Sequence, residues 1–351
     1  MSDRPVIIKL GGDALASPQR IVAQARRLAR RAADGPVVAV ASARRGVTDH
    51  LLGLAQEVAS TAARGAGPGA ATRRVNSRAA LAEGDRAVAS GEIVSASLLA
   101  LALNELGVPA VSLDAREAGV ASQGEFGDAR IQQVVPRRLE RLLARGIVPV
   151  VTGFQGWQRG RVATLGRGGT DTSAVALALA LGGQRTIFVK EAHGLRTADP
   201  KLVPEADCIP EAPHAFLSAL TAAGARVVQT EAATLAETHG LPLEFWSLEG
   251  EVADSVVVQG ASPLGLRAVA TLPGEDFAGI TVLAGAPREL VHEAETLRAA
   301  LAAQGITASE VQPAANGLRF VVPATRATEA TRTLHTVFVS CRPDHSTRQA
   351  S

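Results

Sequence analysis

The sequence predicts an α/β fold with a mainly parallel central sheet, followed by a smaller ferredoxin-like domain. The chain has 351 residues, which is the usual length of two domains rather than one. Up to about residue 250, short apolar runs alternate with segments of helical periodicity, which is the pattern of βαβ units. After residue 263 the pattern becomes two strands, a helix, two strands and a helix.

The first part of the chain repeats one unit, a short apolar strand followed by a helix. Residues 5–10, PVIIKL, predict a buried strand, and a glycine turn leads from it into a helix. The later strands are predicted at 36–42, 109–114, 147–153 and 186–190. The helices are predicted at 17–33, 47–60, 95–107, 135–146 and 171–183. The glycine-rich segment 64–74 predicts an exposed loop within a helical region.

The helical pattern thins out over residues 249–265, where we expect the domain boundary. The sequence therefore predicts one domain over residues 1–250 and a second over 263–340. The strands of the second domain are predicted at 266–273, 279–285, 306–313 and 317–324, and its helices at 289–305 and 325–338. The polar tail 341–351 is expected to be disordered.

Composition limits the partners. The net charge is +2 and the arginines are spread along helices beside acids, so neither nucleic acid nor an anionic membrane is expected. Cys208 and Cys341 lie far apart without metal-ligand spacing, which favours a reducing compartment. The first residues lack a signal-peptide pattern, and the longest apolar run, 174–183, is too short for a membrane span. We expect a cytoplasmic protein.

The candidate binding and catalytic residues stand beside glycines that follow the predicted strands. Lys9, Gly11 and Gly12 follow the first strand, where glycines let backbone N–H groups approach an anion and lysine supplies a point charge. Glycines after a strand usually form a plain turn, which is the alternative here, and no Walker A loop follows. Ser42 and Thr48 offer hydroxyls at the next strand-to-helix crossing, where a helix cap is the alternative.

Two further clusters add opposite charges. Glu92 follows a glycine, so it either caps a helix or binds a substrate ammonium. Residues 162–181, VATLGRGGTDTSAVALALAL, place three glycines, Arg167 and Asp171 before a helix, where the dipole favours anions. N-capping explains Asp171 but not the glycines with Arg167. An arginine and an aspartate beside one loop suit a zwitterion, so an amino acid is the expected ligand.

Five segments, in order and in register over residues 5–235, resemble the motifs of aspartate kinases in the amino acid kinase family. They are KLGGDAL, SARRGVTDHLL, SGEIVSA, VPVVTGFQG with ATLGRGGTDTSA, and GLRTADPKLVPEA. The resemblance implies the family's three-layer sandwich for the first domain and a single ACT-type regulatory unit for the second. A single ACT unit would pair across a homodimer and could bind an amino-acid effector.

The resemblance also implies a reaction and its residues. ATP, with Mg²⁺ held mainly by the nucleotide phosphates, would phosphorylate the side-chain carboxylate of L-aspartate to 4-phospho-L-aspartate, the first step toward lysine, threonine and methionine. The implied catalytic residues are Lys9 and Asp171. The implied substrate-binding residues are Ser42, Thr48, Glu92, Arg167 and Asp171. The implied nucleotide-binding residues are Lys9, Gly11, Gly12, Lys190, Glu191, Arg196, Asp199 and Arg226, and no metal-binding residue is implied.

The sequence departs from the family pattern on the nucleotide side. KEAHG, residues 190–194, replaces T-D-V-D-G, Arg196 replaces a nucleotide-facing tyrosine, and Arg226 replaces a lysine. We therefore expect altered nucleotide binding. Two alternatives stay open: a kinase for another small carboxylate or amino acid, and a non-catalytic regulatory subunit that binds an amino acid. Retention of Lys9 and Asp171 argues against the second.

Overall fold

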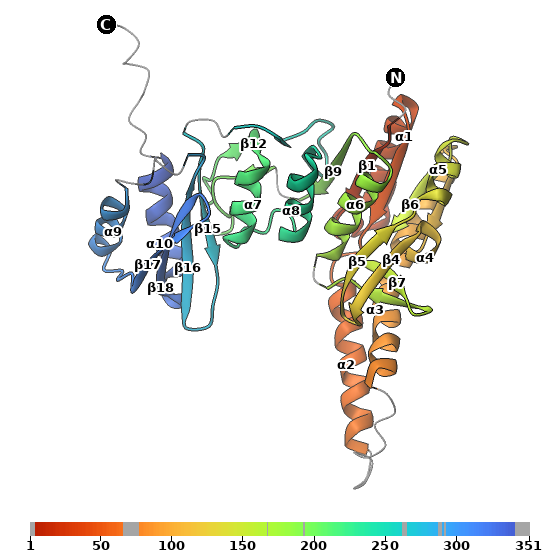
Figure 1. The fold of residues 1–351 in the computed structure, drawn as a ribbon, viewed down its shortest axis with the longest axis horizontal. Coiled ribbons are helices and arrows are strands. Elements are labelled where there is room, and N and C mark those ends of the chain that lie inside the picture. The colour runs from red at the N-terminus through yellow and green to blue at the C-terminus, as the bar shows by residue number, and fades with distance from the viewer. Residues whose placement is uncertain are drawn as a thin grey trace, which may run out of the picture. The chain divides into compact units, whose positions relative to one another are not determined.

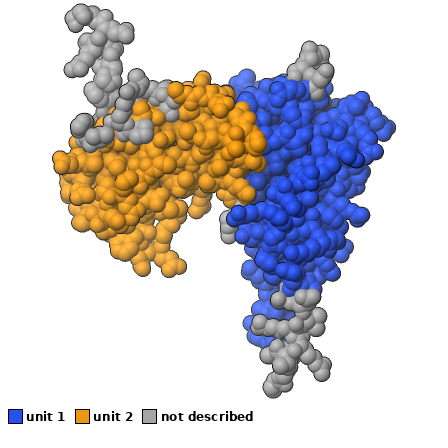
Figure 2. Space-filling view, in the orientation of Figure 1, with its two compact units in different colours: residues 1–192, 241–253 blue, residues 193–240, 254–351 orange. Residues whose placement is uncertain are grey.

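The computed structural model describes residues 4–65, 77–166, 168–191, 194–261, 265–286, 290 and 293–340. The chain forms two compact units, residues 1–192 with 241–253 and residues 193–240 with 254–351 (Figure 2). The boundaries of these units differ from those of the predicted domains, 1–250 and 263–340, and do not test them, so the domains stay predictions. The tail 341–351 and most of the predicted loop 64–74 lie outside the described residues.

A parallel sheet forms the centre of the first unit, with strands in the order β13-β9-β1-β2-β6-β3. Three of them, β9, β1 and β6, are labelled in Figure 1. The strands are β1 Val6–Leu10, β2 Val37–Ala41, β3 Ala110–Leu113, β6 Val148–Thr152, β9 Arg185–Lys190 and β13 Leu243–Ser247. Every residue of β1, β2 and β6 is buried, as expected when both faces of a parallel sheet are covered. The predicted α/β fold is confirmed.

Helices cover both faces of this sheet. On one face, α1 Pro18–Asp34 and α3 Ser77–Glu105 share an apolar core with the strands, in which Ile8 of β1 meets Leu28 of α1 and Leu99 of α3. The next residue of β1, Lys9, points to the opposite face, where α6 Gly169–Ala180 packs against β1, β2 and β9. The unit is thus a three-layer sandwich.

The helix α3 is longer than the segment predicted at 95–107 and runs beside α2 Val47–Gly65 (Figure 1). Of the described helices, one stretch, Arg78–Glu105 within α3, is long and apolar enough to cross a membrane by length and composition. Half of its apolar window is buried, because Ala96, Leu99 and Leu103 pack in the core of the unit.

A second, smaller sheet in this unit has the order β5-β4-β7-β8, and it was not predicted. Its strands are β4 Val120–Glu125, β5 Asp128–Val134, β7 Gln155–Gln158 and β8 Arg161–Thr164. The short helices α4 Ala115–Ala118 and α5 Arg137–Leu143 flank the β4–β5 pair in sequence. The buried Asp85 of α3 ties it to the helix. Its carboxylate accepts hydrogen bonds from the backbone N–H of Gly127 at 2.9 Å and of Thr164 at 2.7 Å.

The second unit contains an antiparallel sheet in the order β15-β16-β18-β17. Its strands are β15 Arg267–Leu272, β16 Phe277–Ala284, β17 Glu310–Ala314 and β18 Gly317–Pro323, with helices α9 Ala294–Ala303 and α10 Ala327–His335. The same unit holds β10 Leu195–Arg196, β11 Cys208–Ile209, β12 Glu211–Pro213, α7 His214–Ala222, α8 Thr230–His239 and β14 Ser255–Val258. The predicted order of two strands, helix, two strands and helix is present. Its assignment as an ACT unit stays a prediction.

Candidate active site

A buried ion pair joins the central sheet to the first turn of α6. Lys9 Nζ of β1 lies 2.8 Å from Asp171 Oδ1, and the two side chains are only 10% and 9% exposed. The helix dipole stabilises a carboxylate in this first turn. The N-cap position belongs to Gly168 and carries no side-chain hydrogen bond, so the capping interpretation of Asp171 is wrong.

The glycines before α6 are required by the backbone. Gly166 and Gly168 have φ of +70° and +78°, which side-chain-bearing residues rarely adopt. A Cβ on Gly169 would lie 2.5 Å from Leu165 Cβ. The loop can therefore turn tightly and start α6 with Asp171 facing β1. Arg167, the predicted carboxylate-binding residue of this loop, lies outside the described residues, so its role stays a prediction.

A second lysine shares the Asp171 carboxylate. Lys190 ends β9, the strand beside β1, and its Nζ lies 3.8 Å from Asp171 Oδ2. Burial lowers the pKa of Lys190, the Asp171 carboxylate raises it, and the Lys9 ammonium lowers it further. Two lysine side chains therefore converge on one carboxylate, and an anion that binds at this point would stabilise the charged form of Lys190.

Glu92 is a buried carboxyl group in the middle of α3, so it does not cap a helix. Its side chain is almost fully buried, and Oε1 accepts a hydrogen bond from the Ala43 backbone N–H at 3.1 Å. Among the described residues, Oε2 has no hydrogen-bond partner. Burial raises the pKa of Glu92 to about 7, against the opposing effect of the Ala43 N–H. An arriving ammonium group would satisfy both the charge and the free oxygen.

The turn after β2 is packed closely between the first glycine cluster and α3. A Cβ on Gly12 would lie 2.9 Å from Ala43 O, and a Cβ on Gly91 would lie 3.0 Å from Ala43 Cβ. These close approaches bring Glu92 to the end of β2. Ser42 follows β2 directly, and its N–H bonds to Leu10 O at 3.1 Å. Thr48 lies in the first turn of α2 and is half-buried.

The other predicted residues of the first unit lie close by. A Cβ on Gly11 would be 3.7 Å from Lys9 Nζ, which is van der Waals contact and places Gly11 beside the lysine head group. Glu191, next to Lys190, is exposed and faces Arg45, with Oε2 3.7 Å from Arg45 Nη1. Arg45 also pairs with Asp13 at 3.0 Å. An exposed group of mixed charges therefore borders the buried Lys9–Asp171 pair.

Three predicted nucleotide-binding residues, Arg196, Asp199 and Arg226, belong to the second unit. Arg196 donates to Ala206 O at 3.0 Å, and the exposed Asp199 accepts from the Lys201 N–H at 2.9 Å. Arg226 is exposed. Arg196 and Asp199 thus make local contacts within their own unit, and the assignment of all three residues to a nucleotide stays a prediction.

The arrangement suits the transfer of a charged group between two anions. Two lysines supply positive charge at the carboxyl ends of β1 and β9, which is where ligands bind in open α/β sheets. Over the described ranges, no three histidine, cysteine, aspartate or glutamate side chains gather as ligands of a metal ion. Sequence reasoning missed that Lys190 and Lys9 share Asp171. The replacement in KEAHG marked Lys190 as unusual, but only the pairing of β9 with β1 brings the two lysines together.

A sequence model of the amino acid kinase family matches residues 4–246. Among curated relatives, the chain is 35% identical over 244 residues to an aspartokinase of Thermus thermophilus, a match that covers 69% of this chain and 56% of that protein. It is 34% identical over 256 residues to the aspartokinase of Mycobacterium bovis, covering 72% and 57%. The chain thus spans little more than half the length of the curated relatives it matches.

Solved structures share the fold. Escherichia coli aspartokinase III, solved with aspartate and ADP, superposes with a TM-score of 0.66 at 23% identity, over 92% of this chain and 79% of that one. Aspartate kinase of Clostridium acetobutylicum gives a TM-score of 0.64 at 14% identity, over 95% and 99%. With the family model matching most of its length and the fold agreeing, this chain belongs to the amino acid kinase family.

Proposed function

We propose that this protein is an aspartate kinase, which transfers the γ-phosphoryl group of ATP to the side-chain carboxylate of L-aspartate. The bond between the γ-phosphorus and the bridging oxygen of the β-phosphate breaks, and a bond from that phosphorus to a carboxylate oxygen forms. ADP leaves with the electron pair of the broken bond. The nucleophile is already ionised near neutral pH, so no group has to remove a proton.

The Lys9–Asp171 contact carries this proposal. In such a reaction the protein contributes positioning and neutralisation of the charge on the transferring group. Lys9 Nζ, held by Asp171 at 2.8 Å, has a fixed place from which to contact phosphate oxygens. Lys190 adds a second cation beside the same carboxylate. Mg²⁺, held mainly by the nucleotide phosphates, would neutralise part of their charge when bound.

Glu92 supports an amino acid as the acceptor. A substrate ammonium group would donate a hydrogen bond to its buried oxygen, which has no partner among the described residues. The same group would stabilise the ionised carboxylate and so lower the raised pKa. Thr48 and Arg167 complete the substrate set by their place in the motifs, and Arg167 would hold the α-carboxylate with two parallel hydrogen bonds. The curated relatives are named aspartokinases, and the Escherichia coli structure holds aspartate and ADP.

The remaining assignments belong to the same proposal. Glu191, Arg196, Asp199 and Arg226 would contact the nucleotide. The β15–β18 sheet with α9 and α10 would be a single ACT-type unit that pairs two copies of the chain and binds an amino-acid effector, since one Escherichia coli aspartokinase III structure holds lysine with aspartate. The protein would work in the cytoplasm on the pathway to lysine, threonine and methionine.

The direct test traps the acyl phosphate. Purified protein is incubated with MgATP, L-aspartate and hydroxylamine, and the aspartyl hydroxamate is measured. We expect product that requires aspartate and is lost in Lys9→Met, while Arg26→Met, an exposed arginine of α1, keeps it. A folded protein that makes no hydroxamate would refute the proposal.

Lys190 favours one second candidate, a kinase for a different small carboxylate, because it changes the charge beside Asp171. The same assay with L-glutamate and N-acetyl-L-glutamate separates the two candidates. Faster hydroxamate formation with either acceptor than with L-aspartate would replace the aspartate assignment.

A further inference from the structure

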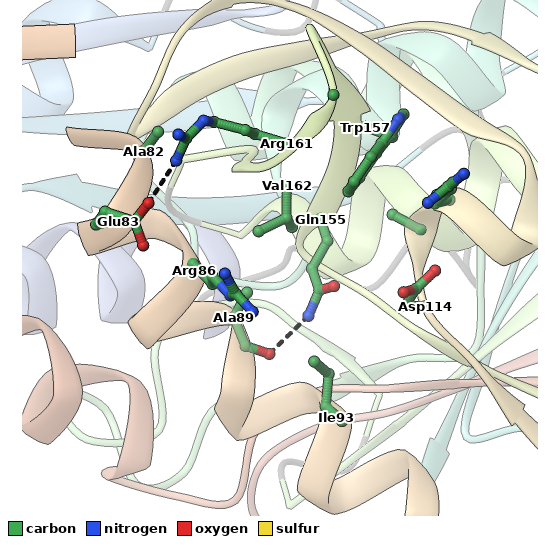
Figure 3. A pocket seen from close by; sticks show the side chains of 13 residues that line it. Ala82, Glu83, Arg86, Ala89, Ile93, Asp114, Gln155, Trp157, Arg161 and Val162 are labelled. Atoms are coloured by element: carbon green, nitrogen blue, oxygen red, sulfur yellow. Dashed lines mark hydrogen bonds and ion pairs between the residues drawn. The ribbon is translucent and has the colours of Figure 1, made fainter. Parts of the chain in front are cut away.

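A cavity of about 520 Å³ opens in the first unit, away from the Lys9–Asp171 pair (Figure 3). One wall is the stretch of α3 from Ala82 to Ile93, the second is the start of α4 at Asp114, and the third is the β7–β8 hairpin from Gln155 to Val162. No described residue of the candidate active site lines it. Its volume falls in the range of small-molecule sites.

The acids in the lining already have partners. Glu83 pairs with Arg161 across the mouth of the cavity, as the dashed line in Figure 3 marks. Asp114 accepts a hydrogen bond from the Glu117 N–H at 2.8 Å and completes the capping box of α4. Glu83 is therefore paired with an arginine of the lining, whereas Asp114 is bonded to a backbone N–H and remains an acidic group beside the cavity.

Two arginines in the lining have no acidic partner among the described residues. Over the described residues, neither Arg86 nor Arg116 forms a hydrogen bond or an ion pair with a carboxylate. Arg116 lies over the ring of Trp157, with its guanidinium carbon 5.1 Å from the ring centre. Arg86 projects from α3 beside the open space (Figure 3). The lining thus holds three arginines against two acids, and this excess of positive charge attracts an anion.

The rest of the lining is mainly apolar, and the side-chain amide of Gln155 holds its walls together. Trp157, Ile93 and Val162 provide apolar surface around the space. The buried Gln155 at its floor donates to Ala89 O at 2.7 Å, which holds the hairpin against α3. Arg116 lies over one face of the half-buried Trp157 ring, so a planar group can stack on the opposite face or pack against the ring edge.

We propose that this cavity is a second ligand site, which binds a small organic anion with a flat apolar body. Arg86 contacts the anionic head group and the Trp157 ring packs against the body. The inference goes beyond the proposed kinase activity, because it assigns a site that shares none of the catalytic residues and needs no turnover to be observed.

The chain is suited to a direct binding test, because it has two tryptophans and no tyrosine. In Trp246→Phe, Trp157 is the one remaining tryptophan, so its fluorescence reports on the cavity. The full chain is titrated with phenylacetate, with phenyl phosphate and with phenylacetamide, the uncharged counterpart. Calorimetry on the unsubstituted chain repeats the comparison without altering Trp246.

We expect saturable binding of at least one of the two anions, with phenylacetamide at least about tenfold weaker. The preferred anion tells whether the head group is a carboxylate or a phosphate. Arg86→Gln is expected to weaken binding by about tenfold or more, whereas Arg26→Gln, an exposed arginine of α1, leaves it unchanged. Circular dichroism and the melting temperature check that both variants fold.

Four results would overturn the proposal. They are equal binding of the amide, no binding of either anion, binding that survives Arg86→Gln, and displacement of the anion by MgATP with L-aspartate. The last result would mean that the probes bind the catalytic site. The first three results are independent of whether the protein phosphorylates aspartate.

Discussion

Glu92→Gln tests the buried carboxyl group at the proposed substrate site. Glutamine keeps the size of the side chain and can still accept the Ala43 N–H at Oε1. It removes the negative charge that would hold a substrate ammonium. The variant therefore separates the charge of Glu92 from its packing.

The raised pKa sets the size of the effect. With a pKa of about 7, roughly one tenth of Glu92 is ionised at pH 6 and about nine tenths at pH 8. If the ammonium binds only the ionised form, KM for aspartate should be about tenfold higher at pH 6 than at pH 8. The direction is fixed: KM falls as the pH rises through 7, because the ionised form accumulates.

The assay is the initial rate of ADP formation against aspartate concentration, at saturating MgATP, between pH 6 and pH 9. In Glu92→Gln we expect a high KM that no longer changes across this range. Titration of ATP affects both proteins, so the difference between their profiles belongs to Glu92. Glu57→Gln, an exposed acid of α2, should follow the unsubstituted protein. Parallel profiles in the Glu92 variant and the parent protein would refute the reasoning.

Three further perturbations test the site and its frame. Between pH 4.5 and pH 7, Glu92 holds a proton in the folded protein and releases it in the unfolded chain, so the free energy of unfolding should fall by about 3 kcal/mol as the pH rises. Urea unfolding followed by tryptophan fluorescence measures this loss, which should be absent in Glu92→Gln. Equal pH slopes in the two proteins would contradict the argument. Lys190→Met should lower kcat about tenfold in the ADP-release assay, and an unchanged kcat would remove Lys190 from the mechanism. Gly12→Ala should destabilise the protein by about 1–3 kcal/mol in urea, because its Cβ would meet Ala43 O at 2.9 Å. Gly53→Ala within α2 meets no described atom within 4 Å and should stabilise by about 0.5–1 kcal/mol, so equal effects of the two alanines would contradict the packing argument.

Much of the first unit could be predicted because its strands are buried on both faces. Runs such as PVIIKL are apolar at nearly every position, which is the pattern of a covered parallel strand. The β4–β5 and β7–β8 hairpins were missed for the opposite reason. Residues such as Gln123, Arg130 and Gln158 make these segments read as polar loops, and Asp85 of α3, far away in the sequence, anchors them. No local pattern reveals such a partner.

The candidate site divides in the same way. Lys9, Glu92 and Asp171 could be singled out because each stands beside glycines that need unusual backbone positions or close packing. The contact of Lys190 with Asp171 depends on the order of strands in the sheet, which alternating strands and helices do not specify. The cavity beside Trp157 depends on the hairpins, so it could not be seen without them.

Lys190, one departure of this chain from the family pattern, adds a basic side chain beside Asp171. Lys190 is held in place, since its Nζ lies 5.8 Å from the centre of the Phe188 ring as well as beside Asp171. A unit charge about 4 Å from another is worth roughly 4 kcal/mol at an effective dielectric constant of about 20. A second ammonium group at that range can compensate for weaker contacts to the sugar and base, because the triphosphate carries most of the charge of the nucleotide. A kinase with altered nucleotide contacts is therefore consistent with an intact carboxylate-phosphorylating site, and we expect its affinity for ATP to depend strongly on ionic strength.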